Sequence, residues 1–442
     1  MLTRTRALAV AVSVGLLLPA GTRAQRFVID LDDPDFMPYP MAVPDFVDLS
    51  GKHEQLATRM ANVLRNNLDI SEAFSIIPRI AYLAPKSEPW TNPSFPDWVK
   101  VGASGLIRAA YTVDDEDGLK ITFRLYDVVA QREALVKHYV GKLTEHRRLV
   151  HRFSDDLYRF FTGQRSIFGT RIAFVGRSLD AKDTIIYVTD FDGHNIQAVV
   201  SNDNLNLLPN WSHDGATLYF TSYLRDNPDL YALNLATRDV RIVSNRRGLN
   251  VGVTASRDGT RLAFTLSKDG NTEIYVMNVD GTNLTRLTRF WGEDVSPTWN
   301  PDGSRIAFVS SRSGHPQIYT MNSSDGSEVR RLTFQGNYNT EPNWSPRPGG
   351  GIVFTARDER NQFDIFVVDP ESGEITRLTQ DQGNNEGPSF SPDGRHIVFT
   401  STRVGGGRKP FIMNSDGRNQ RQLITRRGDF ETPAWSPMLP WD

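Results

Sequence analysis

The sequence predicts an all-β six-bladed β-propeller preceded by a small α/β domain. Three observations lead to this fold class. A proline-aromatic element recurs about every 45 residues through the C-terminal two thirds of the chain. Asp-Gly turns separate short apolar runs within each repeat, and the residues ahead of the first repeat show helix and strand patterns without this period. All-β repeats of about 40 to 50 residues are typical of propeller blades.

The proline-aromatic element is the clearest part of the repeat. Its aromatic position falls at residues 211, 255, 299, 344, 390 and 435, which gives spacings of 44, 44, 45, 46 and 45. Because this position is fixed in every repeat, we expect its side chain to pack between blades rather than to stack on a ligand. The five full copies and one weaker copy are Pro209-Asn210-Trp211, Pro297-Thr298-Trp299, Pro342-Asn343-Trp344, Pro388-Ser389-Phe390, Pro433-Ala434-Trp435 and Val253-Thr254-Ala255.

Each repeat also predicts four strands. A turn such as Asp302-Gly303 precedes an apolar strand of the Ile-Ala-Phe type, and glycine accepts the positive φ that such a hairpin turn requires. These strands begin near residues 171, 217, 261, 305, 351 and 395, and strands of an Ile-Tyr type begin near 185, 229, 273, 317, 364 and 410. An Arg-Leu-Thr type of strand recurs as often. The count therefore predicts six blades.

The repeats are out of phase at the two ends of the predicted propeller. It opens at Arg171-Ile172-Ala173 with no proline-aromatic element before it, and it ends at Pro433-Ala434-Trp435 with no apolar strand after it. We therefore expect the last element to supply the inner strand of the first blade, which would close the ring and remove its open edges.

The domain organisation predicted from these patterns has four parts. Residues 1–24 have the order of a signal peptide, with Arg4 and Arg6, an apolar run over 7–18, and the small residues Thr22 and Ala24 before a cleavage site. A buried helix opening a cytosolic domain is the alternative. Residues 25–40 are expected to form an extended arm, 41–163 the α/β domain and 164–442 the propeller. In the α/β domain we expect helices over 53–66 and 144–161 and strands over 105–113, 119–129 and 135–140.

Composition excludes several classes of function. The chain has no cysteine, which excludes disulfides, thiolate metal sites and a lipid anchor on cysteine. It has 50 basic and 52 acidic residues, and the two kinds are interspersed, so nucleic-acid binding is not expected. After the apolar run at the N-terminus, no segment has the length of a membrane span. The mature protein is expected to be exported and soluble, without direct membrane insertion, and a monomer by itself.

The sequence shows no motif of a catalytic or cofactor-binding site. It has no Gly-Xaa-Ser-Xaa-Gly, no phosphate-binding loop and no His-Glu-Xaa-Xaa-His, and its eight histidines lack the spacing of metal ligands. Asp190-Phe191-Asp192-Gly193 resembles the start of a calcium loop, but Ser201 stands where a glutamate ligand would be needed, which favours a hairpin turn. We predict no catalytic residue, no metal and no cofactor.

The segments that precede each proline-aromatic element are the candidates for binding. They must cross from one blade to the next over one face of the propeller, at 204–208, 248–252, 292–296, 336–341, 383–387 and 428–432. Polar loops on a rigid scaffold are where binding residues concentrate, although ordinary solvated turns are the alternative. The candidate residues are Asn250, Asp294, Ser296, Asn339, Glu341, Glu386 and Glu431.

The whole arrangement resembles the TolB family of the Tol–Pal system. The resemblance rests on the acidic arm, the junction Phe168-Gly169-Thr170-Arg171, the six repeats and the closing segment Phe430-Glu431-Thr432-Pro433-Ala434-Trp435. The second repeat departs from the pattern at Val253 and Ala255.

The resemblance implies a non-catalytic periplasmic adaptor that maintains outer-membrane integrity and helps invagination at cell division. It implies that the channel face binds the Pal lipoprotein, for which the candidates above are the residues, and that the arm binds TolA. In an extended arm Phe27, Ile29 and Leu31 would share one face and could add a strand to a partner sheet, or could pair with the chain's own α/β domain. The alternatives are a secreted propeller enzyme, hydrolase-associated or lyase, and a glycan-binding propeller.

Overall fold

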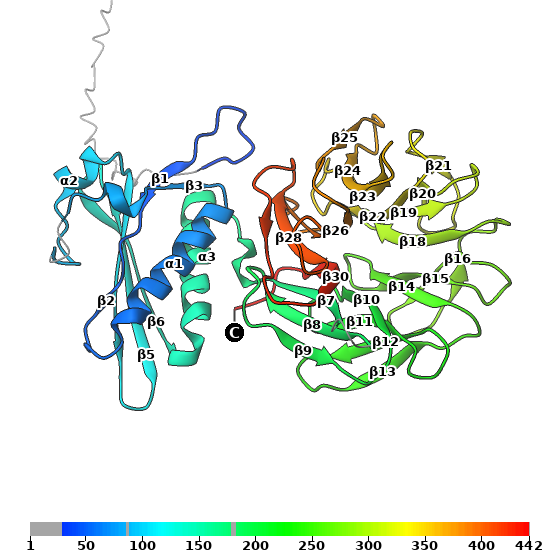
Figure 1. Ribbon diagram of the computed structural model, residues 1–442, viewed down its shortest axis with the longest axis horizontal. Coiled ribbons are helices and arrows are strands. Elements are labelled where there is room, and N and C mark those ends of the chain that lie inside the picture. The colour runs from blue at the N-terminus through cyan, green and yellow to red at the C-terminus, as the bar shows by residue number, and fades with distance from the viewer. Residues whose placement is uncertain (1–28, 85–87, 178–182, 442) are drawn as a thin grey trace, which may run out of the picture.

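The computed structural model describes residues 29–84, 88–177 and 183–441 as an α/β domain beside a six-bladed propeller (Figure 1). The predicted fold class is confirmed. The predicted signal peptide and the start of the predicted arm, including Phe27, lie outside the described residues. Among the described residues, no helix combines the length and the apolar character needed to cross a membrane.

The α/β domain is built on one mixed sheet with the strand order β3-β1-β4-β5-β6, and β2 pairs with β4. The predicted meander is present, and β1 adds to it by pairing in parallel with β3 and β4. Strand β1 begins at Tyr39, so the end of the predicted arm is part of the sheet. The strands are β1 (Tyr39–Ala42), β2 (Val47–Asp48), β3 (Phe74–Ile76), β4 (Gly105–Val113), β5 (Gly118–Asp127) and β6 (Arg132–Lys142).

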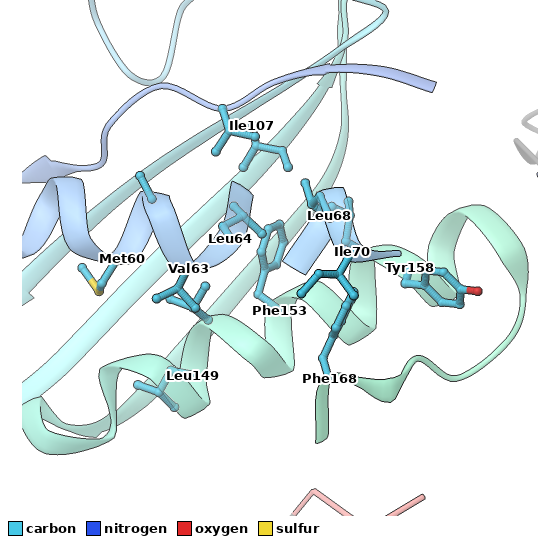
Figure 2. Close-up of a cluster of buried hydrophobic side chains, with 14 of the residues drawn as sticks. Met60, Val63, Leu64, Leu68, Ile70, Ile107, Leu149, Phe153, Tyr158 and Phe168 are labelled. Atoms are coloured by element: carbon cyan, nitrogen blue, oxygen red, sulfur yellow. The ribbon is translucent and has the colours of Figure 1, made fainter. Parts of the chain in front are cut away.

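Two long helices, α1 (Glu54–Ile70) and α3 (His146–Thr162), pack together against this sheet (Figure 2). Their apolar stripes meet in one core, where the rings of Phe123 and Phe153 stack with centroids 4.0 Å apart. Helix α1 runs four residues past its predicted end because Leu68 and Ile70 continue the buried stripe. The short helices are η1 (Arg79–Ala81), α2 (Phe95–Lys100), η2 (Leu143–Glu145) and η3 (Ile167–Gly169).

The propeller consists of six four-stranded antiparallel sheets. Blade 1 contains β30 (Asp429–Trp435), β7 (Arg171–Arg177), β8 (Ile185–Asp190) and β9 (Gln197–Val200). Blade 2 contains β10 (Asn206–Trp211), β11 (Thr217–Ser222), β12 (Asp229–Asn234) and β13 (Val240–Ser244). Blade 3 contains β14 (Asn250–Ala255), β15 (Arg261–Leu266), β16 (Glu273–Asn278) and β17 (Thr285–Arg286). Blade 4 contains β18 (Asp294–Trp299), β19 (Arg305–Ser310), β20 (Gln317–Asn322) and β21 (Arg330–Arg331). Blade 5 contains β22 (Asn339–Trp344), β23 (Ile352–Arg357), β24 (Phe363–Val368) and β25 (Ile375–Arg377). Blade 6 contains β26 (Asn385–Phe390), β27 (His396–Ser401), β28 (Lys409–Asn414) and β29 (Arg421–Gln422).

The C-terminal strand closes the ring as the phase of the repeats predicts. In Figure 1 the red strand β30 lies beside the green strand β7, and Trp435 is paired with Ile172 across the ladder. The first blade therefore combines the two ends of the propeller sequence.

The antiparallel blades give the propeller two different faces. We call the face that carries the Asp-Gly turns after the inner strands the turn face, and the opposite face, which carries the segments between blades, the crossover face. The α/β domain contacts the turn face at blade 6, where the His396 imidazole donates a hydrogen bond to the carbonyl oxygen of Ile70 (2.9 Å) and Arg421 pairs with Asp69 (3.0 Å). The crossover face lies on the other side.

Candidate functional site: the crossover mouth of the propeller channel

Every inner strand carries a β-bulge near the crossover end of the channel. The ladder shifts register within β10, β14, β18, β22, β26 and β30. One residue in each bulge has a left-handed backbone, with φ between 48° and 65° at Leu208, Gly252, Ser296, Glu341, Gly387 and Thr432. A bulge re-aims the side chains beside it. The six bulges therefore form a ring of irregular backbone that we call the crossover mouth.

The bulges are fastened from blade to blade. The backbone N–H of Ser296 donates to Thr265 Oγ1 of the preceding blade (3.2 Å), and the N–H of Gly387 donates to Thr355 Oγ1 in the same way (3.1 Å). A left-handed conformation at a residue other than glycine is unfavourable by itself, so these contacts help to hold the backbone in place. These contacts hold the mouth in place at blades 4 and 6.

Three of the predicted binding residues are placed differently from our expectation. Asn250, Asp294 and Asn339 are the first residues of inner strands rather than parts of exposed loops, and at most 3% of each is exposed. Asn250 donates to the carbonyl oxygens of Arg246 and Gly248, which bend the chain into the strand. Asparagine and aspartate bind nearby backbone strongly in turns, so a polar residue here fixes the crossover.

A polar residue stands at this first position of the inner strand in all six blades. The residues at the equivalent position are Asn206, Asn250, Asp294, Asn339, Asn385 and Asp429. Asp294 pairs with Arg312 (2.8 Å), and Asn339 donates to Gln317 Oε1 (2.9 Å). A polar residue that recurs at about 45-residue spacing in every repeat indicates a structural role, and this signal was present in the sequence.

The other four predicted residues lie at the crossover mouth itself. Ser296 and Glu341 occupy bulge positions, and Glu386 and Glu431 lie next to the bulges of blades 6 and 1. Glu341 Oε2 accepts hydrogen bonds from Thr355 Oγ1 and from the N–H of Gly387, both at 2.8 Å. Glu431 pairs with Arg408 (2.5 Å). Three consecutive blades thus contribute one carboxylate each.

The carboxylates act on one another electrostatically. Burial raises the pKa of Glu386 above its usual value of 4.5, and the neighbouring charges of Glu341 and Glu431 raise it further, while Arg408 opposes them. Among the described residues Glu386 makes no ion pair within 4 Å. With three acids and one arginine, this side of the mouth has an excess of negative charge and favours a ligand that brings cationic or N–H donor groups.

Two exposed aromatic side chains lie on the crossover face, between the outer strand of one blade and the inner strand of the next, and the sequence patterns did not indicate them. Trp291 is 85% exposed before β18 and Phe334 is 70% exposed before β22. Arg331 lies over the ring of Phe334 (4.8 Å to the centroid), and Phe290 packs on Trp291 (4.9 Å between centroids). Large exposed aromatic groups are typical of protein-binding surfaces.

The repeated tryptophans, in contrast, have the packing role that we expect from their spacing. Trp211 and Trp435 are 4% and 6% exposed, and their indole N–H groups donate to the Ala434 carbonyl oxygen (3.0 Å) and to Thr170 Oγ1 (2.9 Å). Together with Pro437, Met438 and Pro440, the aromatic positions line a cavity of about 620 Å³ at the turn-face end of the channel.

The described part of the predicted arm is docked on the chain's own domains. The N–H of Ile29 donates to the carbonyl oxygen of Phe161 (2.7 Å), and Ile29 and Leu31 pack against the core of the α/β domain. Asp32 then pairs with Arg347 and Arg395 of the propeller, each at 2.9 Å. Burial raises the pKa of Asp32, but the hydrogen bond from Arg347 and the charges of both arginines outweigh it, so this pKa lies below 3.8. The arm therefore bridges the two domains.

Comparisons with known proteins match the chain over both domains. The family model for the TolB beta propeller domain matches residues 158–439, and the model for the TolB amino-terminal domain matches residues 27–134. The Tol-Pal system protein TolB of Anaeromyxobacter dehalogenans is 43% identical over 99% of this chain and 100% of the relative. The TolB of Myxococcus xanthus is 41% identical over 97% of this chain and 99% of the relative.

A solved structure agrees with these matches. The crystal structure of TolB from Acinetobacter baumannii superposes with a TM-score of 0.77 and 28% identity, and the match covers 92% of this chain and 98% of that one. The similarity extends over the α/β domain and the propeller together.

Proposed function

The chain belongs to the TolB family of Tol-Pal system proteins, and we propose that it is a non-catalytic periplasmic adaptor within that system. Its crossover mouth binds the Pal lipoprotein, and its N-terminal arm binds TolA. Through these two contacts it maintains outer-membrane integrity and assists invagination during cell division.

The observation that carries the Pal proposal is the combination on the crossover face of a ring of six bulges, a cluster of carboxylates and exposed aromatic side chains. The α/β domain covers part of the turn face, so more of the crossover face is open to a partner protein. Burial and the charges of Glu341 and Glu431 raise the pKa of Glu386, and a donor group of a partner would relieve this repulsion. Asn250, Asp294 and Asn339 support the mouth from beneath and are not proposed as direct contacts.

Calorimetric titration with purified Pal tests this proposal. Replacing Glu341, Glu386 and Glu431 together by glutamine should weaken Pal binding, because charge pairs at an interface can each contribute more than 1 kcal/mol. The matched control replaces Glu328, Glu371 and Glu374, which are exposed acids on the turn face. If the variant at the crossover mouth binds Pal as tightly as the unchanged protein and the control variant do, Pal binds at another surface.

The TolA proposal rests on the alternation of Phe27, Ile29 and Leu31 and on the way the arm is held. In its described part the arm is held by one backbone hydrogen bond at Ile29, by partial burial of Ile29 and Leu31, and by an ion-pair cluster at Asp32. A segment held by contacts of this kind can leave its place and add as a strand to a partner sheet. The docked arm and the TolA-bound arm are then two states of the same residues.

Deleting residues 25–33 from the mature chain tests the arm. TolA binding should disappear, because the strand that would pair with TolA is removed, while Pal binding should remain. The matched control replaces the arm by a Gly/Ser segment of equal length, which keeps the spacing and removes the side chains. A deleted protein that binds TolA with native affinity contradicts the proposal for the arm and leaves the Pal proposal standing.

A further inference from the structure

A cluster of potential metal ligands lies where helix α3 meets the first propeller blade. His151 comes from α3, and Asp190 and Asp192 come from the turn between β8 and β9. One ligand atom from each of these residues lies within 4.8 Å of the other two. The predicted hairpin turn is present there, since the N–H of Gly193 donates to the carbonyl oxygen of Asp190. The sequence favoured a hairpin turn over a metal site at Asp190 and Asp192. It gave no reason to connect these carboxylates with His151, because the histidine belongs to the other domain.

The imidazole of His151 is buried and points into this cluster. Its side chain is 3% exposed, and among the described residues its Nε2 has no hydrogen-bond partner. Nε2 lies 3.7 Å from Asp192 Oδ2, close to the roughly 3.3 Å that separates two ligands of a tetrahedral Zn²⁺ ion with bonds of about 2.0 Å.

The other ring nitrogen of His151 lies against Asn67 on α1. The amide nitrogen of Asn67 is 2.9 Å from Nδ1 and also donates to Ser154 Oγ (2.8 Å), while the amide oxygen has no partner among the described residues. Metal binding requires this amide to turn over and to give up its bond to Ser154 Oγ, so that its oxygen accepts the Nδ1 proton and the Nε2 lone pair is free. Metal-binding histidines commonly donate their second N–H to such an acceptor, which fixes the tautomer and the orientation of the ring.

The cluster is also accessible from solvent. A cavity of about 620 Å³ is bounded by residues of α3, by Asp190 and His151, and by the C-terminal residues 439–441. It provides an entry path and space for a water molecule as the fourth ligand. One nitrogen and two carboxylate oxygens, with an open fourth position, suit Zn²⁺ better than Ca²⁺ or Mg²⁺, which prefer six or more oxygen ligands.

We propose that His151, Asp190 and Asp192 bind one Zn²⁺ ion at the seam between the α/β domain and the propeller. The ion cross-links α3 to blade 1. Arg147 competes with it, because its guanidinium now pairs with Asp192 Oδ2 and would have to turn toward the cavity, where its side chain is already 17% exposed. The proposal does not depend on which partners the crossover mouth or the arm bind.

Titration of the tag-free, EDTA-treated full chain with Zn²⁺, followed by calorimetry, tests the site. We expect one ion per chain, and Co²⁺ should give the visible absorption of a tetrahedral site. His151→Ala and Asp190→Asn should each weaken Zn²⁺ binding by roughly tenfold or more. Arg147→Gln should strengthen it, because the competing charge is gone. His315→Ala, which changes an exposed histidine on the crossover face, is the matched control and should bind as the unchanged protein does.

Thermal unfolding without metal shows whether each variant is folded. If His151→Ala does not fold, Asp190→Asn still tests the site, because it keeps the shape of the side chain that it replaces. Zn²⁺ should raise the melting temperature of the unchanged chain and not that of Asp190→Asn. Absence of Zn²⁺ binding by the unchanged chain, or equal affinity in Asp190→Asn, overturns the proposal.

Discussion

The indole N–H of Trp211 donates a hydrogen bond to the carbonyl oxygen of Ala434, 223 residues further along the chain, at 3.0 Å. Trp211 ends the inner strand of blade 2, and Ala434 lies in the inner strand of blade 1. This bond joins β30 to blade 2, and the pairing of β30 with β7 joins it to the rest of blade 1. The stability of the ring should therefore depend on its final residues.

Trp435→Ala should lower the free energy of unfolding of the propeller by roughly 3–5 kcal/mol, because it empties a buried aromatic site and removes the bond to Thr170. Denaturant unfolding followed by fluorescence measures this loss. Trp291→Ala, at an exposed tryptophan, is the control and should leave the unfolding midpoint unchanged. Equal midpoints for the two variants would contradict the role assigned to the closing strand.

Trp291→Ala combined with Phe334→Ala should weaken Pal binding by about 2 kcal/mol or more, since exposed aromatic side chains at an interface often contribute that much. The melting temperature should stay the same because both side chains project into solvent. Calorimetry with Pal measures the change. Val240→Ala, at an exposed apolar side chain on the outer strand of blade 2, controls for loss of apolar surface alone.

Glu386→Gln should stabilise the free protein at neutral pH. The pKa of Glu386 is raised in the folded state, so folding is opposed by its charge above that pKa, and the penalty fades as the pH falls toward 4.5. The variant should therefore melt at a higher temperature than the unchanged protein at pH 7, and the difference should shrink toward pH 4. A difference that is independent of pH would show that the carboxylate carries no such penalty.

Asp32→Asn should loosen the docked arm. The pKa of Asp32 is lowered, so its ion pairs stabilise docking above pH 3.8 and are lost as the pH falls below that value. Exposed pairs of this kind contribute about 1 kcal/mol or less. Hydrogen exchange at the Ile29 amide should accordingly be about 2- to 5-fold faster in the variant at pH 7. Asp35→Asn, at an exposed arm residue without these arginine contacts, should exchange at the native rate.

The repeat predicted the blades well because the features that define them are local. The Asp-Gly turns and the aromatic position specify hairpins and packing within about 45 residues, so counting them was sufficient. The crossover residues were harder to interpret. Asn250 and Asp294 are polar and precede a proline-aromatic element or its weaker copy, which suggested exposed loops, yet their side chains are buried and bonded to the chain. Their exact recurrence, rather than their polarity, indicated their role.

The contacts between the domains could not be read from the sequence. His151, Asp192 and Asn67 come together only because α1 packs beside α3 and α3 lies against the turn between β8 and β9 of the first blade, and no periodic pattern relates their positions. The docking of Ile29 on Phe161 and of Asp32 on the propeller has the same origin. Alternation predicted a strand-like arm but did not specify its partner.

The place of β30 in blade 1 also sets an order of events for a chain that is synthesised from its N-terminus. Strand β7 is made more than half a chain before the strand that completes its sheet. Until residues 429–435 have left the ribosome, the first blade keeps an unpaired edge and the ring stays open. A nascent chain of this protein therefore cannot close its propeller until residues 429–435 have been made, and its first and last blades stay free to move apart until then.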